Sequence, residues 1–234
     1  MAAALTPTAE NGYFIASTDA KRTTPHDDVT REVEIFIKHH PMAVRLGSQP
    51  EFSESRPHSH TPKSNVQHSF IGRTLIGPEK IVVPPFTWIE RNGKSLIQIL
   101  YLGSDLCGHP GIVHGGMLAT ILDEGFANCC SAAFPNKSGM TAKLDITYRS
   151  PVFARNYVVL RVNMAKMQGR KIWVEGKIET LVTEGEEPVL MVEASALFIE
   201  SRQSTVGTSF SLFIQQANSM AKAPGENSPL AACF

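Results

Sequence analysis

The feature that most constrains the fold is a series of alternating apolar runs, interrupted once by a helical pattern. Five runs rich in β-branched and aromatic residues are predicted to be strands, at residues 95–102, 141–148, 156–166, 171–182 and 189–199. Residues 114–130, HGGMLATILDEGFANCC, instead repeat apolar side chains at three and four positions, which predicts one largely buried helix. Hairpin-length connections between the last three runs predict an antiparallel meander. One helix covering one face of an antiparallel sheet of five or six strands is an α+β fold.

The exposed edge of such a sheet is a pairing hazard, so we expect a second copy of the chain to join it. In the strand at 141–148, strict alternation predicts that one set of side chains faces the core: Ala142, Leu144, Ile146 and Tyr148. The same alternation predicts that the other set faces away: Thr141, Lys143, Asp145 and Thr147.

Composition narrows the classes of protein. The 234 residues carry 22 basic and 22 acidic side chains, so the net charge of zero argues against nucleic-acid binding or membrane coating as the main role. No segment approaches the roughly 18 apolar residues of a membrane span. Four cysteines without CxxC spacing favour a reducing compartment, and no metal site is expected. The first residues do not resemble a secretory signal, so we expect a cytoplasmic protein, with a mitochondrial location as the alternative.

Three regions are predicted along the chain. Residues 1–70 are expected to be an N-terminal extension with a flexible leader, one amphipathic helix at about 27–40, and a linker. Residues 71–200 form the main domain, and residues 201–234 are expected to be a flexible tail with a short helix between Phe210 and Met220. His58 and His60 in the linker have no carboxylate or cysteine nearby in the sequence, which makes a metal site there improbable.

Candidate chemistry gathers in and around the predicted helix. Gly115 and Gly116 at its start expose backbone N–H groups where the helix dipole is positive, which suits a carbonyl or an oxyanion, although they also suit close packing of helix on sheet. Asp123 lies in an otherwise apolar stretch, where a carboxylate is costly unless it is paired or needed. Gly115 and Asp123 are eight positions apart, which separates them by about 12 Å along one helix. If both are catalytic, the site must combine Gly115 of one chain with Asp123 of another.

These residues resemble a known family. HGGMLATILDE, with Gly-Ile-Val before it and MTAKLDITYRSPV after it, is similar to the hotdog-fold thioesterase superfamily, specifically the PaaI-like acyl-CoA thioesterases, over roughly residues 71–200. The resemblance implies a long central helix wrapped by an antiparallel sheet. It also implies homodimers joined edge to edge, often paired into dimers of dimers, and no cofactor, with a coenzyme A thioester as the substrate.

The resemblance implies roles for individual residues. Asp123 matches the aspartate that acts as general base or nucleophile, and Gly115 matches the glycine whose N–H polarises the thioester carbonyl. His114 matches the histidine that shapes the helix start, and Thr141 matches the Ser/Thr that positions the attacking water. Many relatives have an Asn five or six residues before the histidine. Here Gly108 and His109 occupy that region, so His109 is the candidate for the second carbonyl contact, and Gly116 is a further candidate in substrate binding.

Coenzyme A carries three phosphate groups, which require cations near the entrance. The candidates are Arg149 and a cluster around the hairpin that follows the strand at 156–166: Lys166, Arg170 and Lys171. Solvated hairpin cations are the ordinary alternative. Cys129 and Cys130 have no partnered base and are interpreted as small buried residues.

Three other functions stay open. An acyl or polyketide chain could be released from an acyl carrier protein instead of coenzyme A. A hotdog hydratase or dehydratase would use an Asp and a His, which Asp105 and His109 echo only faintly. A non-catalytic acyl-binding dimer would need neither Asp123 nor Thr141, so the presence of both argues against it.

Overall fold

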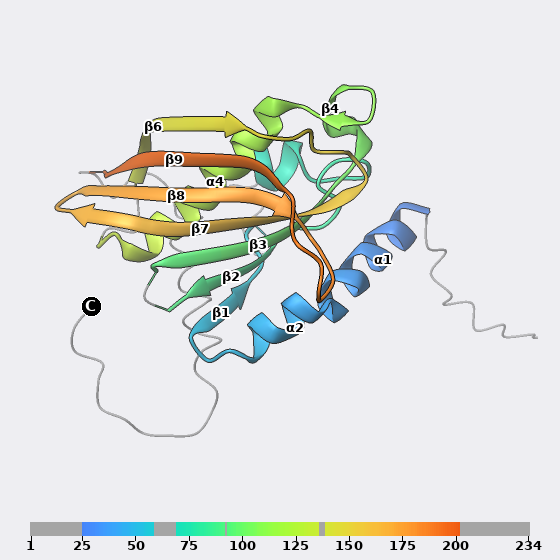
Figure 1. Ribbon diagram of the computed structural model, residues 1–234, viewed down its shortest axis with the longest axis horizontal. Coiled ribbons are helices and arrows are strands. Elements are labelled where there is room, and N and C mark those ends of the chain that lie inside the picture. The colour runs from blue at the N-terminus through green and yellow to red at the C-terminus, as the bar shows by residue number, and fades with distance from the viewer. Residues whose placement is uncertain (1–24, 59–68, 92, 136–138, 202–234) are drawn as a thin grey trace, which may run out of the picture.

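A computed structural model describes residues 25–58, 69–91, 93–135 and 139–201 (Figure 1). Residues 1–24 of the predicted leader, His60, the helix between Phe210 and Met220, and the rest of the predicted tail beyond residue 201 lie outside these residues. A seven-stranded antiparallel sheet has the order β1-β2-β3-β7-β8-β9-β6. Its strands are β1 (Phe52–Ser55), β2 (Phe86–Glu90), β3 (Ser95–Leu102), β6 (Gly139–Tyr148), β7 (Asn156–Gln168), β8 (Lys171–Thr180) and β9 (Leu190–Glu200). The prediction of an α+β fold with a hotdog arrangement is confirmed.

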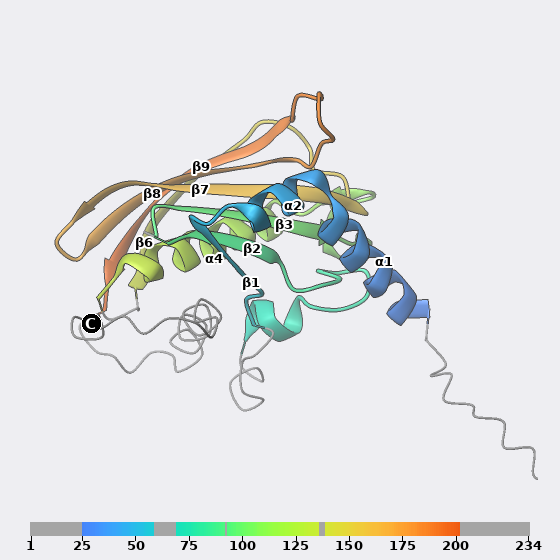
Figure 2. The ribbon, with the colours of Figure 1, turned by 90° about the horizontal axis from the view of Figure 1, so that it is seen from below.

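Helix α4 (Gly115–Ala133) lies along one face of this sheet, as the apolar period of residues 114–130 predicts (Figure 2). Its side chains Leu118, Leu122 and Phe126 are at most 3% exposed and pack into one large core. Burying each such side chain contributes about 1.5–3 kcal/mol. The core fixes which face of α4 is buried, and therefore where its polar residues emerge.

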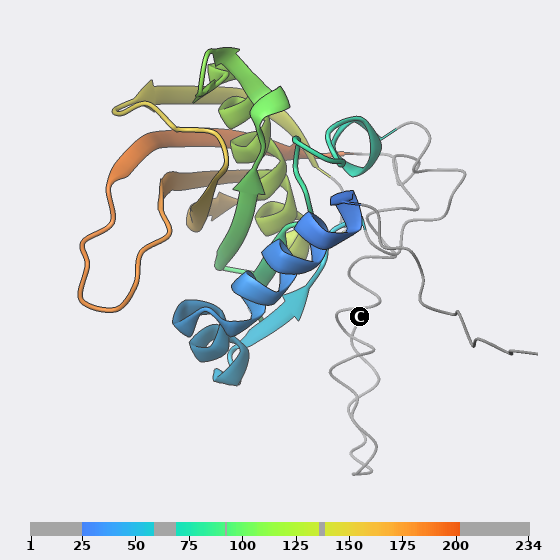
Figure 3. The same ribbon diagram turned by 90° about the vertical axis from the view of Figure 1, so that its right-hand side faces the viewer.

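The other face of the sheet is covered in part by the N-terminal extension. Helix α1 (Pro25–His39) is the predicted amphipathic helix, and α2 (Pro41–Ser48) follows it, with the His40 side chain capping its first turn. Figure 3 shows both helices and β1 at the end of the sheet remote from β6. The two helices form a second core against residues of the sheet half formed by β1, β2, β3 and β7 and of the segment before β2: Val33, Ile37, Ala43 and Leu46 on Val82, Val83, Phe86, Trp88, Ile99 and Val159.

Strand β3 shows why its sequence is an almost continuous apolar run. Leu96, Leu100 and Leu102 belong to the core under α4. Ile99 lies on the opposite face, in the core under α1 and α2, and Ile97 and Tyr101 pack against the same core. A strand that is buried on both faces has no polar side to alternate with its apolar side.

The predicted linker and the boundary at residue 71 are wrong in one respect. Residues 52–55 form β1, which pairs with β2 from Phe52 opposite Glu90 to Ser55 opposite Thr87, so the sheet begins inside the region assigned to the extension. The strand FSES is short and mostly polar because it is an edge strand, and it carries no apolar period to detect. Arg56 then ties the extension down, donating to the Pro84 carbonyl at 3.1 Å and lying 3.6 Å from the Phe86 ring centroid.

Short elements lead the chain to the start of α4. They are the π-helical turn η1 (Phe70–Thr74), the 3₁₀ turn η2 (Ser104–Leu106), β4 (Cys107–His109) and β5 (Ile112–Val113). The Glu79 carboxylate accepts hydrogen bonds from Ser104 Oγ at 2.5 Å and from Arg155 Nε at 3.2 Å. These bonds lower the pKa of Glu79, and the Ser104 hydroxyl contributes most. His114 N–H donates to the Leu106 carbonyl at 2.8 Å, which positions the N-terminus of α4.

Among the described residues, no helix combines the length and the apolar character needed to cross a bilayer.

Candidate functional site

The start of α4 is capped by its own preceding histidine. His114 has an extended backbone, and its ring Nδ1 accepts from Gly116 N–H at 2.9 Å. The His114 carbonyl accepts from Met117 N–H at 2.8 Å and from Leu118 N–H at 3.3 Å. Since Nδ1 is an acceptor, the neutral ring carries its proton on Nε2. His114 therefore shapes the helix start, as predicted.

This cap leaves one amide for a ligand. Of the first four N–H groups of α4, only that of Gly115 has no acceptor anywhere in the described part of the chain. It lies where the helix dipole is most positive. The Gly116 N–H, a predicted substrate contact, is instead held by the His114 ring.

Tyr148 fixes Gly115 from the other side, a contact that sequence reasoning missed. Its hydroxyl donates to the Gly115 carbonyl at 2.9 Å, although the two residues are 33 positions apart. A Cβ on Gly115 would lie 3.3 Å from the Tyr148 ring, so the glycine allows this close approach. The Tyr148 side chain is still 52% exposed, because β6 is the edge of the sheet.

Thr141 and Asp123 meet beneath the other end of β6. The Thr141 hydroxyl donates to Asp123 Oδ1 at 2.6 Å, while Oδ2 has no partner among the described residues. The prediction that Thr141 faces away from the core is wrong. A β-bulge between Thr141 and Lys143 leaves Ala142 as the extra, exposed residue and turns Thr141 to the face of its cross-strand neighbour, the buried Phe198.

The two functional groups of α4 therefore lie apart in one chain. Gly115 and Asp123 are separated by about 12 Å along the helix axis. Edge strand β6 contacts both of them, Gly115 through Tyr148 and Asp123 through Thr141. Each half of the predicted two-residue site thus lies at one end of the edge strand β6.

A cleft of about 510 Å³ opens at the Gly115 end. It brings together several predicted site residues and Tyr148: His109, His114, Gly115 and Arg149 all line it. Arg149 is not free, because its Nε donates to Glu193 Oε1 at 3.0 Å. Asp105, which the hydratase alternative would need, is exposed and is not part of this lining.

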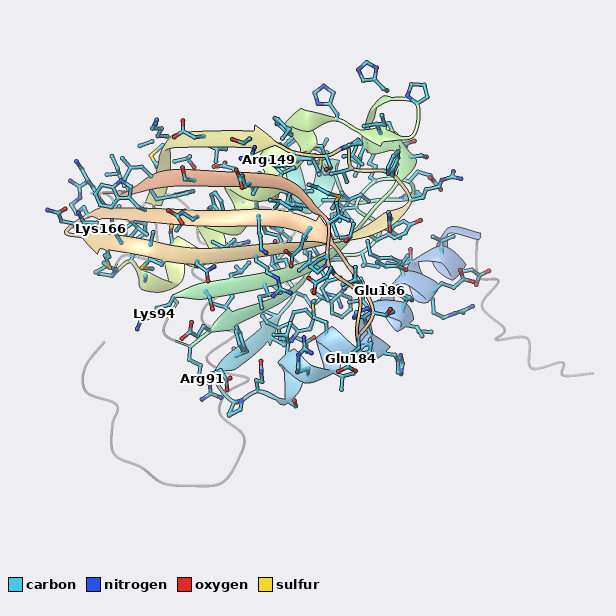
Figure 4. The ribbon with its side chains drawn as sticks, viewed as in Figure 1. Arg91, Lys94, Arg149, Lys166, Glu184 and Glu186 are labelled. Carbon is cyan, nitrogen blue, oxygen red and sulfur yellow. The ribbon has the colours of Figure 1, made fainter. Side chains whose placement is uncertain are left out.

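The hairpin cations lie at the opposite end of the strands from Arg149 (Figure 4). Arg170 Nη2 donates to the Glu200 carbonyl at 2.5 Å, and Lys166 Nζ lies 5.2 Å from the Trp173 ring centroid. Lys171 is in register with Ile199, which pairs with Met140 beside Thr141, so this cluster lies near the Asp123 end of the site. Lys94 is at the same end, a cation that the sequence pattern did not single out (Figure 4).

Cys129 and Cys130 are fully packed in the core, as predicted. Burial, with a smaller contribution from the charge of Glu90, raises the pKa of Cys129 to about 12, and burial also raises the pKa of Cys130. A thiol with so high a pKa supplies almost no thiolate at neutral pH, so neither residue can act as a nucleophile there.

Comparisons with known proteins show the family of the chain. A family model described as "Thioesterase superfamily" matches residues 110–184, the segment that holds the α4 cap, Asp123, Thr141 and Tyr148. An uncharacterised protein of Schizosaccharomyces pombe is 33% identical over 161 residues, which cover 67% of this chain and 91% of the relative. The chain belongs to the thioesterase superfamily.

Other members of the superfamily match a smaller part. The acyl-coenzyme A thioesterase THEM4 of Mus musculus is 37% identical over 107 residues, 46% of this chain and 44% of the relative, so the match spans less than half of that protein. A solved thioesterase superfamily protein from Shewanella loihica PV-4 is 21% identical, with 46% of this chain and 84% of that chain covered and a TM-score of 0.39.

The name of one relative bears on location. An uncharacterised protein of Candida albicans, named as mitochondrial, is 33% identical over 132 residues, 55% of this chain and 58% of the relative. That name agrees with the mitochondrial alternative, and the comparisons give the cytoplasmic prediction no support.

Proposed function

We propose that this protein hydrolyses acyl-CoA thioesters to a carboxylic acid and free coenzyme A, at a site shared by two copies of the chain. One observation carries the proposal: the edge strand β6 contacts both Gly115, whose carbonyl accepts from Tyr148, and Asp123, whose carboxylate accepts from Thr141. The coenzyme A thioesterase name of the mouse relative supports the choice of substrate class.

A second copy completes the site by simple geometry. Antiparallel pairing of β6 with the same strand of a partner sets the Thr141 end of one strand beside the Tyr148 end of the other. Asp123 of one chain then approaches Gly115 of its partner, which the 12 Å spacing along a single helix (about 1.5 Å per residue) does not allow within one chain. The same pairing removes the bare sheet edge.

The chemistry follows from the hydrogen bonds. Thr141 occupies Oδ1 of Asp123, which leaves Oδ2 to accept a proton from water as its oxygen attacks the thioester carbon. The carbonyl oxygen gains negative charge and is held by the Gly115 N–H of the partner copy. The C–S bond then breaks, and the leaving thiolate takes up the proton.

Two substitutions at Gly115 isolate the role of its amide. Proline is accepted at the first position of a helix and removes only the N–H, and the extended backbone of His114 suits a residue that precedes proline. Gly115→Ala introduces a comparable Cβ contact but keeps the N–H. We expect Gly115→Pro to lower kcat about 10²-fold, as for one lost oxyanion donor, and Gly115→Ala to lower it only a few-fold. Equal losses in the two variants would contradict the assignment.

Mixing two inactive variants tests the shared site. A mixed dimer of Gly115→Pro and Asp123→Asn contains one site with both functional groups intact and one site with neither. Unfolding and refolding the mixture should therefore restore about a quarter of the wild-type rate of thiol release, by random pairing of site halves. A mixture no more active than its parents would show that the two groups do not meet across chains.

The cations at the hairpin end are proposed to hold coenzyme A phosphates. Reversing the charges of Arg170 and Lys171 should raise KM for an acyl-CoA and leave KM for the matching acyl-pantetheine ester, which lacks the terminal nucleotide, unchanged. An unchanged KM for the acyl-CoA would show that Arg170 and Lys171 do not bind coenzyme A. It would favour Arg149 as the phosphate-binding residue, or an acyl carrier protein as the carrier of the acyl group.

We also propose a mitochondrial location, on the strength of the Candida albicans relative's name. Fractionation of cells that express the tagged chain should recover it with mitochondria. Recovery in the cytosolic fraction would restore the first prediction.

A further inference from the structure

The edge strand β6 carries two opposite charges near its middle (Figure 1). Lys143 and Asp145 are two residues apart, so both side chains point to the same face of the strand. They are 68% and 57% exposed, and Lys143 Nζ lies 2.7 Å from Asp145 Oδ2. The residue between them, Leu144, points to the other face and packs against the core under α4. A strand that pairs with β6 therefore meets a positive, an apolar and a negative side chain in this order.

Two identical copies of β6 can pair in only a few registers. Residues that lie directly opposite each other in antiparallel strands share one face of the sheet. Because successive residues alternate between faces, a two-fold axis passes beside one residue of β6 and never between two. The shared site needs the Thr141 end of one strand beside the Tyr148 end of the other. This requirement places the axis near the middle of that stretch, at Leu144 or at Asp145.

The choice between these two registers matters for the site. Moving the axis by one residue displaces the partner strand by two residues, which is about 6.8 Å. This displacement is more than twice the length of a hydrogen bond. Asp123 of one copy and the Gly115 amide of the other can therefore reach the same thioester group in one of the two registers and not in both.

The charges distinguish the two registers. With the axis at Leu144, Lys143 of each copy lies directly opposite Asp145 of the partner copy, so two unlike pairs form across the seam. With the axis at Asp145, the two Asp145 carboxylates lie directly opposite each other, and each Lys143 lies opposite Thr147. Opposed residues have Cβ atoms about 4.5–5.5 Å apart, where unlike charges stabilise a sheet and like charges destabilise it. The pattern therefore favours the axis at Leu144.

We propose that Lys143 and Asp145 select the register in which two copies of this chain pair along β6, with the two-fold axis at Leu144. The inference rests on the shared site of the proposed function. Both residues have a positioning role, because they bring Asp123 and Gly115 of different copies together without touching the substrate. The same charges oppose pairing with an edge strand that lacks the complementary pattern, so they also select the partner.

The test reverses one charge at a time and measures the dissociation constant of the dimer by sedimentation. In Lys143→Asp the seam holds two negative pairs, and in Asp145→Lys it holds two positive pairs. Each variant should raise the dissociation constant at least about 30-fold, since two unlike pairs become like pairs. In an equimolar mixture every negative side chain faces a positive one, so mixed dimers should form within about fivefold of the wild-type dissociation constant. A mixture that pairs no more tightly than its parents would overturn the inference.

The competing register makes a different prediction for the same variants. With the axis at Asp145, Asp145→Lys exchanges one like pair for another, and Lys143→Asp acts only opposite Thr147. The dissociation constants of both variants would then stay close to the wild-type value, which would overturn the inference. The double variant Lys143→Asp with Asp145→Lys should restore wild-type pairing of identical copies, and failure to do so would also contradict it.

A matched control separates the seam from the rest of the sheet. Glu175 on β8 and Asp145 on β6 are both in register with Ser195 on β9, so Glu175 lies in the same cross-strand row, two strands away from the edge. Glu175→Lys makes the same change in charge as Asp145→Lys and should leave the dissociation constant unchanged. Asp145→Asn removes an attraction without adding a repulsion, so this variant should remain dimeric and active. Equal effects of Glu175→Lys and Asp145→Lys would contradict a role specific to the seam.

An activity measurement separates failure of the register from failure of the proposed function. Lys143→Asp is combined with Asp123→Asn in one chain, and Asp145→Lys with Gly115→Pro in the other. Mixed dimers then form exclusively, and with one intact site in each they should release thiol at about half the wild-type rate. Selective pairing without thiol release would support the register and contradict the proposed function. Recovery of activity without charge-selective pairing would contradict the register alone, and a monomeric wild-type protein would overturn both.

Discussion

The half of the sheet formed by β1, β2, β3 and β7 carries α1 and α2 on its outer face, and its strands β3 and β7 pack against α4 on the other face. Within the described part of the chain, the half formed by β8, β9 and β6 packs against α4 alone. Its outer face carries charged residues such as Glu175, Lys177 and Glu193 around a hollow of about 440 Å³. That half ends in β6, whose outer edge is covered by no strand among the described residues.

We therefore expect the covered half of the sheet to determine the stability of the fold and the β6 edge to carry the chemistry. Apolar area is buried on both faces of β3 and β7, whereas the bare edge carries Thr141, which contacts Asp123, and Tyr148, which contacts Gly115. The extension is therefore an integral layer of the domain and not an appended arm. Substitutions in the covered half should act on folding, and substitutions of Thr141, Tyr148 and the α4 residues that they contact should act on catalysis.

The largest expected effect is at the bare edge. Asp123→Asn should lower kcat for an acyl-CoA about 10³-fold, because an amide cannot accept the proton of the attacking water. Asp145→Asn is the matched control, since Asp145 is on the same strand as Thr141, is 57% exposed and pairs with Lys143 at 2.7 Å. Thiol release measured for both variants should separate them. Retention of more than a tenth of the activity by Asp123→Asn would place the base elsewhere.

In the covered half, Ile37→Ala should lower the free energy of unfolding by about 3 kcal/mol, the usual cost of truncating a buried isoleucine. Ile37 is 0% exposed between α1 and the sheet, whereas Ile35 on the same helix is 49% exposed. Ile35→Ala should cost less than about 0.5 kcal/mol. Urea unfolding measures both values, and similar small losses would mean that α1 does not contribute to the core.

Alkaline pH should lower the free energy of unfolding, because the buried thiol of Cys129 ionises more readily in the unfolded chain. The raised pKa of Cys129, about 12, keeps this thiol protonated in the folded chain, while in the unfolded chain it ionises above about pH 8.5–9. Above that pH the unfolded state is favoured, and the free energy of unfolding falls by about 1.4 kcal/mol per pH unit until the folded thiol also ionises near pH 12. The slope between pH 9 and 10 should be shallower by this amount in Cys129→Ala, and equal slopes would show that the thiol is not shielded.

The smallest expected effect concerns Tyr148 on the edge strand β6. Tyr148→Phe removes the hydrogen bond to the Gly115 carbonyl and should lower kcat about fivefold, which corresponds to one ordinary hydrogen bond. Tyr101→Phe, in the covered half, alters an aromatic contact with Tyr157 and should leave kcat unchanged. A comparable loss in Tyr101→Phe would show that the two halves are not functionally separate.

Local periodicity carried most of the fold prediction. The helix predicted at 114–130 is α4, and the five predicted strands are β3, β6, β7, β8 and β9, because each has an apolar period that its own residues display. Strands β1 and β2 were not predicted, so the sheet has seven strands and not the expected five or six. The sequence of β1, FSES, has no apolar period, and this strand is recognised only by its pairing with β2.

The site was predictable in its identities but not in its contacts. Gly115, Asp123 and Thr141 stand out in the sequence, yet the orientation of Thr141 depends on a bulge, which the register of β9 determines and TAKLDITY does not reveal. The bonds from Tyr148 to Gly115 and from His58 to Glu124 join residues 33 and 66 positions apart, so only the folded chain shows them.

The histidine cap has a consequence for selectivity among oxygen ligands. A helix start with several open amides attracts phosphate, which needs multiple donors around a full negative charge. Here the imidazole of His114 accepts the hydrogen bond of the Gly116 amide. Of the first four amides of α4, the Gly115 N–H is then the one without an acceptor among the described residues. A single amide discriminates against a phosphate dianion. It suits a carbonyl oxygen that is neutral in the substrate and gains negative charge during the reaction.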